Sequence, residues 1–366
     1  MKLYKSAKDN KLNRILIFVV FTFVFILFVV IYFKKNLFLF QSKTSTSFQS
    51  DFLLSQPCPR GSENFNCYRD YYTNIVKKFG ISQAFADLKK RYEVDDFVRS
   101  ECHQLTHVIG HAAASKFENV SQAFYHGDHF CWSGYYHGIL ESILSRIGRE
   151  NLTNELNNIC KDIPGKDNYS FDYYNCLHGL GHGIMALTHN ELFEALSYCD
   201  ILIGEWEQKS CASGVYMENI MADSRNHVTK YLKPDNPLYP CDISPEKYKD
   251  ECYKMQTSYM LRLNNYDFKQ TFNLCRQAEP EYRELCYQSL GRDASGLTIS
   301  NLYRTKEICF LGETKEQKLN CIIGAAKDFV SYYHSDQQAI ELCNLVEDND
   351  IKTKCLDAVI SFFELF

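Results

Sequence analysis

The chain has 366 residues, of which 45% are hydrophobic, and it carries a formal net charge of -5 at pH 7. Beyond its first residues it holds no basic cluster, which excludes nucleic acid as a partner, because phosphate binding requires a patch of Lys and Arg. It also lacks a nucleophile elbow, a phosphate-binding loop, a dinucleotide fingerprint and the C-x-x-C-H signature of covalent haem.

The first predicted element is an apolar segment without charge, residues 15–33. At about 1.5 Å per residue, a helix of this length just crosses a bilayer. Lys34 and Lys35 follow directly and no small-x-small cleavage site appears, which favours a membrane anchor over the alternative, a cleaved signal peptide. More basic residues precede the segment than follow it, so residues 1–14 are predicted to be cytoplasmic. Residues 34–57 are predicted to form a flexible linker.

Sixteen cysteines follow the apolar segment, and none precedes it. An even, regularly spaced set of cysteines is typical of an oxidising compartment, because the cytosol keeps thiols reduced. The sequence therefore predicts a single-pass membrane protein whose domain from residue 58 onward is extracytoplasmic.

Four of these cysteines, Cys241, Cys275, Cys309 and Cys343, lie 34 residues apart, and each is followed by a partner cysteine. A period of 34 residues is the length of one helix-turn-helix unit, and apolar residues between the cysteines recur at helical spacing. We therefore predict an all-α fold of disulfide-clamped helical hairpins, stacked as a solenoid or toroid.

Counting back from these cysteines extends the pattern toward the N-terminus, where it becomes irregular. We predict irregular, histidine-rich repeats over residues 58–230 and regular repeats over residues 231–366. The predicted bridges are Cys160–Cys176, Cys199–Cys211, Cys241–Cys252, Cys275–Cys286, Cys309–Cys321 and Cys343–Cys355. The other four cysteines are ambiguous, and the favoured pairs are Cys58–Cys67 and Cys102–Cys131.

On period and cysteine pairing, residues 195–366 resemble the tetratricopeptide and Sel1-like solenoids, particularly their cysteine-rich secreted forms. Neither the Trp-Leu-Gly-Tyr pattern of the former nor the glycine and alanine positions of the latter are kept. The resemblance implies a surface that binds a protein or peptide partner.

Histidines are concentrated in the irregular part, where ten of the eleven lie between residues 103 and 227. Residues four apart share one face of a helix, so side chains at this spacing could bind one ion together. The candidate metal ligands at such spacings are His103, His107 and His111, then His137 and Glu141, then His178 and His182.

The cysteine register relates these segments to one another. His137 and His182 each lie six residues after the second cysteine of their unit, and Glu218 lies seven residues after Cys211. Equivalent positions on stacked helices face the same groove, so we expect the side chains to converge on a mononuclear or dinuclear site. Imidazole and carboxylate ligands suit zinc, iron, manganese or copper. Glu141 and Glu218 are the candidate catalytic bases for a metal-bound water, and a redox reaction fits equally.

Several other interpretations stay open. The segment "HQLTHVIGH" is similar to the zinc-peptidase motif H-E-x-x-H, but Gln104 replaces the general base. Bis-histidine haem binding is a weaker alternative. The histidines could also line a groove as polar residues, and the glycines beside them could serve only close helix packing. Two functions therefore compete: a metal site, with or without catalysis, and a non-enzymatic scaffold that binds a protein or peptide.

Overall fold

The computed structural model describes residues 58, 64–221, 229–298 and 301–364. The predicted cytoplasmic segment, membrane span and linker, residues 1–14, 15–33 and 34–57, lie outside this part of the chain. No helix within the described residues is both long and apolar enough to cross a membrane.

The described residues form helices and turns without a β-strand, so the all-α prediction is confirmed. The helices of the N-terminal part are α2 (Phe65–Phe79), α3 (Ile81–Val94), α4 (Asp96–Ser100), α5 (Cys102–Ala114), α6 (Val120–Tyr125), α7 (Gly134–Ile147), α8 (Arg149–Ile159), η1 (Lys166–Asn168), α9 (Phe171–Leu187), α10 (Leu192–Cys199) and α11 (Glu205–Met221). Those of the C-terminal part are η2 (Cys241–Ile243), η3 (Glu246–Tyr248), α12 (Lys249–Leu263), α13 (Phe268–Cys275), η4 (Pro280–Tyr282), α14 (Arg283–Leu297), α15 (Leu302–Cys309), α16 (Lys315–Tyr333), α17 (Gln337–Asn344) and α18 (Asn349–Phe363).

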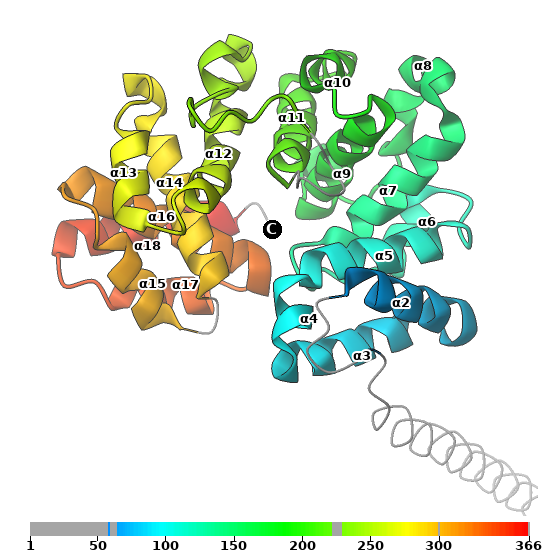
Figure 1. Ribbon diagram of the computed structural model, residues 1–366, viewed down its shortest axis with the longest axis horizontal. Coiled ribbons are helices and arrows are strands. Elements are labelled where there is room, and N and C mark those ends of the chain that lie inside the picture. The colour runs from blue at the N-terminus through cyan, green and yellow to red at the C-terminus, as the bar shows by residue number, and fades with distance from the viewer. Residues whose placement is uncertain (1–57, 59–63, 222–228, 299–300, 365–366) are drawn as a thin grey trace, which may run out of the picture. The chain divides into compact units, whose positions relative to one another are not determined.

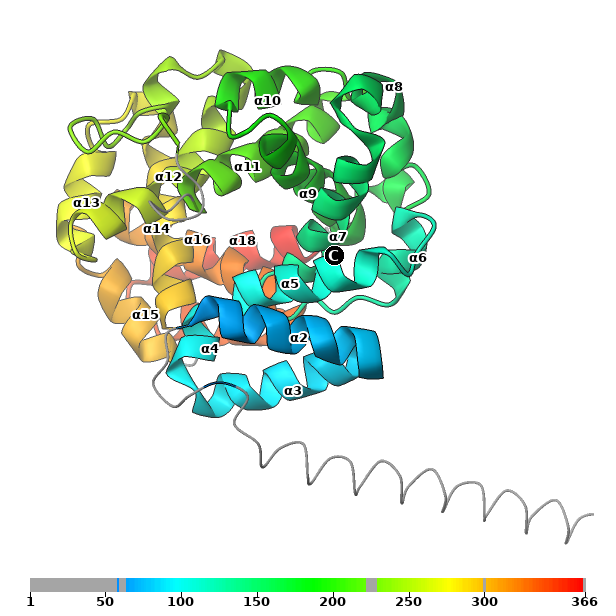
Figure 2. The same cartoon turned by 45° about the vertical axis from the view of Figure 1, so that its right-hand side comes forward.

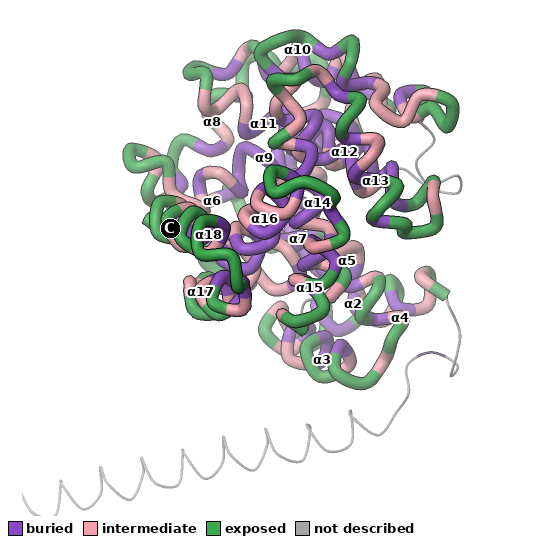
Figure 3. Tube along the Cα trace, turned by 90° about the vertical axis from the view of Figure 1, so that its left-hand side faces the viewer, coloured by how far each residue is buried: buried purple, intermediate pink, exposed green. Residues whose placement is uncertain are grey.

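The longer helices pack side by side in chain order, α5 on α7, then α9, α11, α12, α14, α16 and α18. Short helices such as α8, α10, α13, α15 and α17 lie outside them, as Figure 1 shows. In Figure 3, buried residues concentrate on α9, α14 and α16, whereas the outer helices and turns are largely exposed. The long helices therefore form an inner layer, and their inner faces are the natural location of a shared site.

Within the unit Glu63–Phe366, Figure 2 shows the helices following one another around a ring, and the N-terminal part contacts the C-terminal part. The turn before α7 contacts the end of α16, where the rings of Trp132 and Tyr332 lie 4.9 Å apart. His129 and His334 make a second contact, with ring centroids 4.5 Å apart. Side chains from the histidine-rich part thus come close to the C-terminal helices.

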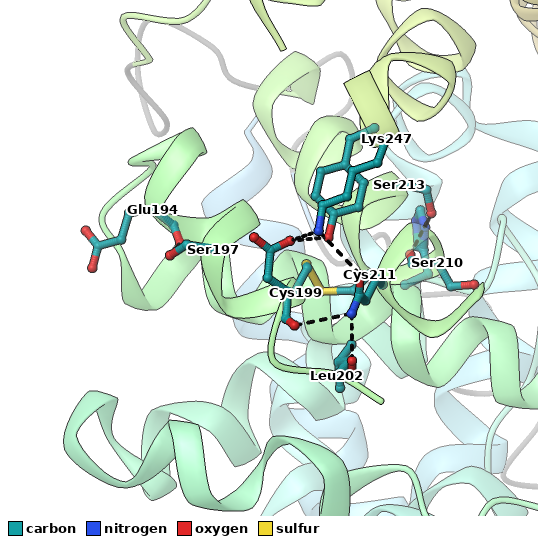
Figure 4. Close-up of a disulfide and its surroundings, with 12 residues drawn as sticks. Glu194, Ser197, Cys199, Leu202, Ser210, Cys211, Ser213 and Lys247 are labelled. Carbon is teal, nitrogen blue, oxygen red and sulfur yellow. Dashed lines mark hydrogen bonds and ion pairs between the residues drawn. A yellow bond between two sulfur atoms is a disulfide. The ribbon is translucent and has the colours of Figure 1, made fainter. Parts of the chain in front are cut away.

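Six disulfides each join a short outer helix to the long helix that follows it, and Cys102–Cys131 joins the start of α5 to the turn before α7. All six predicted bridges from Cys160 to Cys355 are present, and so is the less certain Cys102–Cys131 pair. Cys58 and Cys67 are also disulfide-bonded, and no cysteine is free. Figure 4 shows the Cys199–Cys211 bridge, which ties the last residue of α10 to α11 beside Ser213. This number of disulfides indicates an extracytoplasmic or secreted domain.

Three pairs of inner helices approach so closely that only glycine fits between them. A Cβ at any of these positions would overlap a backbone carbonyl of the neighbouring helix. The positions are Gly110 and Gly138 between α5 and α7, Gly181 and Gly214 between α9 and α11, and Gly291 and Gly324 between α14 and α16. The packing role predicted for the glycines near the histidines is therefore confirmed at Gly138, Gly181 and Gly214.

Replacing Gly324 by Ala is expected to destabilise the domain by about 1 to 3 kcal/mol, because the new methyl group meets the carbonyl of Gln288 and forces α14 and α16 apart. The matched control is Gly296→Ala on α14, where the Cβ would lie 3.8 Å from Trp132 Cζ2. The control is expected to be neutral or stabilising by up to about 1 kcal/mol, since alanine favours helix. Urea unfolding with the disulfides intact measures both, and equal losses would contradict this explanation.

Removing the Cys343–Cys355 bridge by replacing both cysteines with alanine is expected to cost about 3 kcal/mol. The bridge closes a loop of 12 residues and thereby restricts the unfolded chain. Alanine is chosen because both positions are fully buried. Guanidinium unfolding under oxidising conditions tests this. A loss below about 1 kcal/mol would show that packing alone holds α17 against α18, contrary to the chain-entropy estimate.

Candidate metal centre

All of the histidines and carboxylates predicted as metal ligands gather where α5, α7, α9 and α11 pack together. Their ligand atoms form four overlapping groups, and within each group the atoms lie within 4.8 Å of one another. The groups are His103, His107 and His137; His137, His178 and His182; His107, His111 and Glu141; and Glu141, His182 and Glu218. We call these eight residues the histidine cluster.

The first imidazole pair lies on α5, where His103 and His107 are one turn apart. The Nδ1–H of His103 donates to the carbonyl of Cys131, at 2.9 Å, and the Nδ1–H of His107 donates to Glu141, at 3.0 Å. Neither acceptor can donate a proton, so each histidine ring carries a proton on its Nδ1. When the ring is neutral, its Nε2 therefore has a lone pair. The two Nε2 atoms lie 3.2 Å apart, a distance at which one proton or one metal ion can lie between them.

A second pair on α9 repeats this arrangement. The Nδ1 of His182 lies 2.7 Å from Glu218, and the Nδ1 of His178 lies 2.7 Å from Ser213 Oγ. The Ser213 hydroxyl already donates to the carbonyl of Ser210, so it accepts from His178. The Nε2 atoms of His178 and His182 are again 3.2 Å apart.

His137 on α7 lies between the two pairs. Its Nδ1 is 3.3 Å from the Nε2 of His107, and its ring stacks on His182 with centroids 4.3 Å apart. The Nε2 of His137 is buried and has no hydrogen-bond partner. A buried polar atom without a partner is costly, which points to a ligand on this side of the ring.

The nitrogen spacings match those of a metal site. Zinc binds imidazole nitrogen at about 2.0 to 2.1 Å, so two ligands at the tetrahedral angle lie about 3.3 Å apart. The three contacts between histidine nitrogens measure 3.2, 3.2 and 3.3 Å. The first pair could therefore hold one ion together with the Nδ1 of His137, and the second pair has a nitrogen of His137 within 4.8 Å.

His111 differs from the other histidines of the cluster. It is 45% exposed at its side chain, and its Nε2 contacts Glu141 at 2.7 Å while its Nδ1 contacts Ser142. Both ring nitrogens are thus engaged, and the residue serves mainly to orient Glu141, which holds His107 in turn.

The electrostatics keep most of the imidazoles neutral. Burial, followed by the neighbouring His107, lowers the pKa of His103 to about 3. Burial also holds the pKa values of His137 and His178 well below the ordinary range, with His182 as the next cause in both. For His107, burial lowers the pKa but the Glu141 carboxylate outweighs it, so its pKa is raised. Neutral imidazole is the form that binds metals.

A strained turn supports the first pair. Cys131, Trp132 and Ser133 all have left-handed backbones, with φ of 57°, 54° and 60°. Such a conformation costs an ordinary residue about 1 to 2 kcal/mol. The turn presents the Cys131 carbonyl to His103, and the Cys102–Cys131 bridge holds it beside the start of α5. Backbone strain of this kind is characteristic of functional sites.

The remaining histidines lie away from the cluster. His126 and His189 are exposed, whereas His129 and His334 contact each other at the junction of the turn before α7 with the end of α16. His227 lies outside the described residues.

Sequence reasoning missed a second polar group, on α12, α14 and α16. Ser258 donates to Asp293 at 2.7 Å and accepts from Arg292 at 2.7 Å. Asp328 on α16 accepts from Ser295 and is buried. A signal was present, because Arg292, Asp293 and Asp328 lie six or seven residues after the second cysteine of their hairpins, as His137 and His182 do.

Comparison of the chain with protein-family models, curated proteins and solved structures finds no match. The chemistry of this centre is therefore argued from its own geometry.

Burial raises the pKa of Asp328 to about 6, so the folded state favours the protonated acid. A raised carboxyl pKa means that stability is highest below the unfolded value near 3.8 and falls as pH rises through 6. The loss amounts to about 3 kcal/mol at most, for a shift of roughly two pKa units. Asp328→Asn removes this dependence of stability on pH. The free energy of unfolding of the variant, relative to that of the natural chain, should therefore rise between about pH 4 and pH 6.

Urea unfolding at pH 4 and pH 7 measures this difference, with Asp357→Asn on the exposed face of α18 as the baseline. If the stability difference between Asp328→Asn and the natural chain stays constant with pH, the raised pKa of Asp328 is contradicted.

Proposed function

We propose that the domain binds two transition-metal ions at the histidine cluster. The observation that carries the proposal is that the Nε2 atoms of each of two histidine pairs lie 3.2 Å apart, with the partnerless Nε2 of His137 beside them. A buried nitrogen without a hydrogen-bond partner is costly unless a ligand such as a cation reaches it. Polar lining of a groove would satisfy these atoms with donors instead.

One ion would be held by His103, His107 and the Nδ1 of His137, and the other by His178, His182 and the Nε2 of His137. To bind through both nitrogens, His137 would release its ring proton to solvent and bridge the two ions as an imidazolate. All-imidazole ligand sets favour zinc, copper or iron over manganese, which prefers oxygen ligands. Because no cysteine is free, thiolate ligands are excluded.

The outer partners of the imidazoles support this proposal. Metal-bound histidines usually donate their other N–H to a carboxylate, carbonyl or hydroxyl group, which fixes the tautomer and the ring orientation. Glu141, Glu218, the Cys131 carbonyl and Ser213 hold these positions. The two glutamates thus orient ligands, and a role as proton acceptor for either remains a proposal.

A bound ion would supply Lewis acidity or redox chemistry. We leave open whether the centre is catalytic. The competing function, a scaffold that binds a protein or peptide on its repeat surface, remains the alternative and requires no metal.

We also retain two proposals from the sequence: that residues 15–33 anchor the chain in a membrane with a cytoplasmic N-terminus, and that the hairpins are variants of one repeat. The apolar segment without charge and the basic residues before it support the first. The 34-residue cysteine spacing supports the second.

Elemental analysis of the full chain, purified through a tag without histidine and dialysed after incubation with Zn²⁺, Cu²⁺ or Fe²⁺, tests the metal proposal. About two equivalents of one metal are expected, as the two ligand sets require. His107→Ala and His182→Ala should each lose one equivalent, because each removes a ligand from a different set.

The control is His189→Asn, an exposed histidine with φ of 54°, a conformation that asparagine tolerates. It should retain the full metal content. Less than about a tenth of an equivalent in the natural chain would refute the metal centre. A single equivalent would refute the two-ion arrangement.

A further inference from the structure

A cavity of about 390 Å³ adjoins the histidine cluster, a size within the usual range for small-molecule sites. His103 lines it on one side, and residues of α11, α12, α14 and α16 line the other. We call it the central cavity. All of its lining residues belong to the described part of the chain.

The central cavity is formed by equivalent positions on successive inner helices. Met217, Ser258, Arg292, Asp293 and Asp328 line it, and each lies six or seven residues after the second cysteine of its hairpin. The same register brings His137 and His182 into the histidine cluster. The cavity and the cluster are therefore two parts of one inner surface.

Most of the cavity wall is apolar. Met217, Ile220, Leu261 and Phe268 contribute aliphatic and aromatic surface, and Trp132 reaches in from the strained turn. Pockets of this composition bind the apolar body of a ligand and orient it through a few polar groups.

The charged groups at the cavity balance one another. Arg292 is bound by Asp293 at 2.7 Å, and Arg262 donates to the carbonyl of Ile220. Asp328 is the remaining carboxyl group and accepts from Ser295. Above about pH 6, where Asp328 is ionised, two arginines thus stand against two aspartates, so the wall then has no excess charge to attract an ion.

We propose that the central cavity is the substrate chamber of the metal centre and takes an uncharged molecule with an apolar, ring-sized body and a hydroxyl or carbonyl group. This inference rests on the proposed metal centre, because the chamber reaches the ligands through His103. The apolar residues hold the body, and the polar groups on α12, α14 and α16 orient its polar end.

The two tryptophans of the chain allow a direct binding test. Trp132 lines the cavity, whereas Trp206 stacks on Tyr173 elsewhere. In the full chain carrying Trp206→Phe, Trp132 is the remaining indole, and its emission reports on the cavity. The probes are 6-methoxy-2-acetonaphthone, which is neutral, and 6-methoxy-2-naphthoate, an anion with the same ring system.

The neutral ketone is expected to quench Trp132 emission with saturation at one equivalent and to bind at least tenfold more tightly than the anion. Gly296→Leu should weaken binding at least tenfold, because Gly296 lines the cavity and its Cβ position is open enough for a larger side chain. Ser361→Leu on the exposed face of α18 adds the same bulk outside and should have no effect.

Any of three results would overturn the proposed substrate chamber. These are the absence of saturable quenching, unchanged affinity in Gly296→Leu, and binding of the anion as tight as that of the ketone. Metal content of the same samples is measured separately, so failure of the metal centre is distinguished from failure of the cavity. In the Co²⁺-loaded chain, the ketone should shift the visible absorption bands of the metal. Unshifted bands would refute the connection between the cavity and the centre.

Discussion

Close approach of the inner helices is the constraint on which the histidine cluster depends. A Cβ at Gly138 would overlap the backbone of His107, and one at Gly214 would overlap the backbone of His178. Two of the three close helix contacts therefore lie beside ligand-bearing residues. Helix axes usually lie about 8 to 10 Å apart. At that distance, histidine side chains from three helices would be too short to contact one another. Here α7 lies between α5 and α9, and His137 can contact both.

The two halves of the domain handle buried polarity in different ways. In the C-terminal half, Arg292 is paired with Asp293, and Asp328 is hydrogen-bonded to Ser295, so opposite charges and hydroxyl groups satisfy one another. In the N-terminal half, the Nε2 of His137 is buried without a partner, and the backbone before α7 is strained. Unsatisfied atoms and strain persist in a fold only where the surrounding structure enforces them, and they concentrate at sites of function.

The sequence was sufficient to predict seven of the cysteine pairs and the histidine cluster, because both follow from regular spacing. A helix returns to the same face every three to four residues, which places His103 beside His107 and His178 beside His182. The sequence was not sufficient to predict the polar group of Arg292, Asp293 and Asp328. These residue types are common on exposed helix faces, and only the cysteine register distinguishes them. The turn at Trp132 had no signal at all, because three successive residues without glycine give no indication of a left-handed backbone.

The bridge between each short helix and the next long helix also determines what a protease could do to this domain. The turn between the helices is the exposed part of each hairpin, and exposed turns are where proteases cut. Cleavage between Cys275 and Cys286, for example, would leave both fragments covalently joined and the inner helices in place. A domain built in this way tolerates nicks in its outer layer, which suits a protein facing the proteases of an extracytoplasmic space.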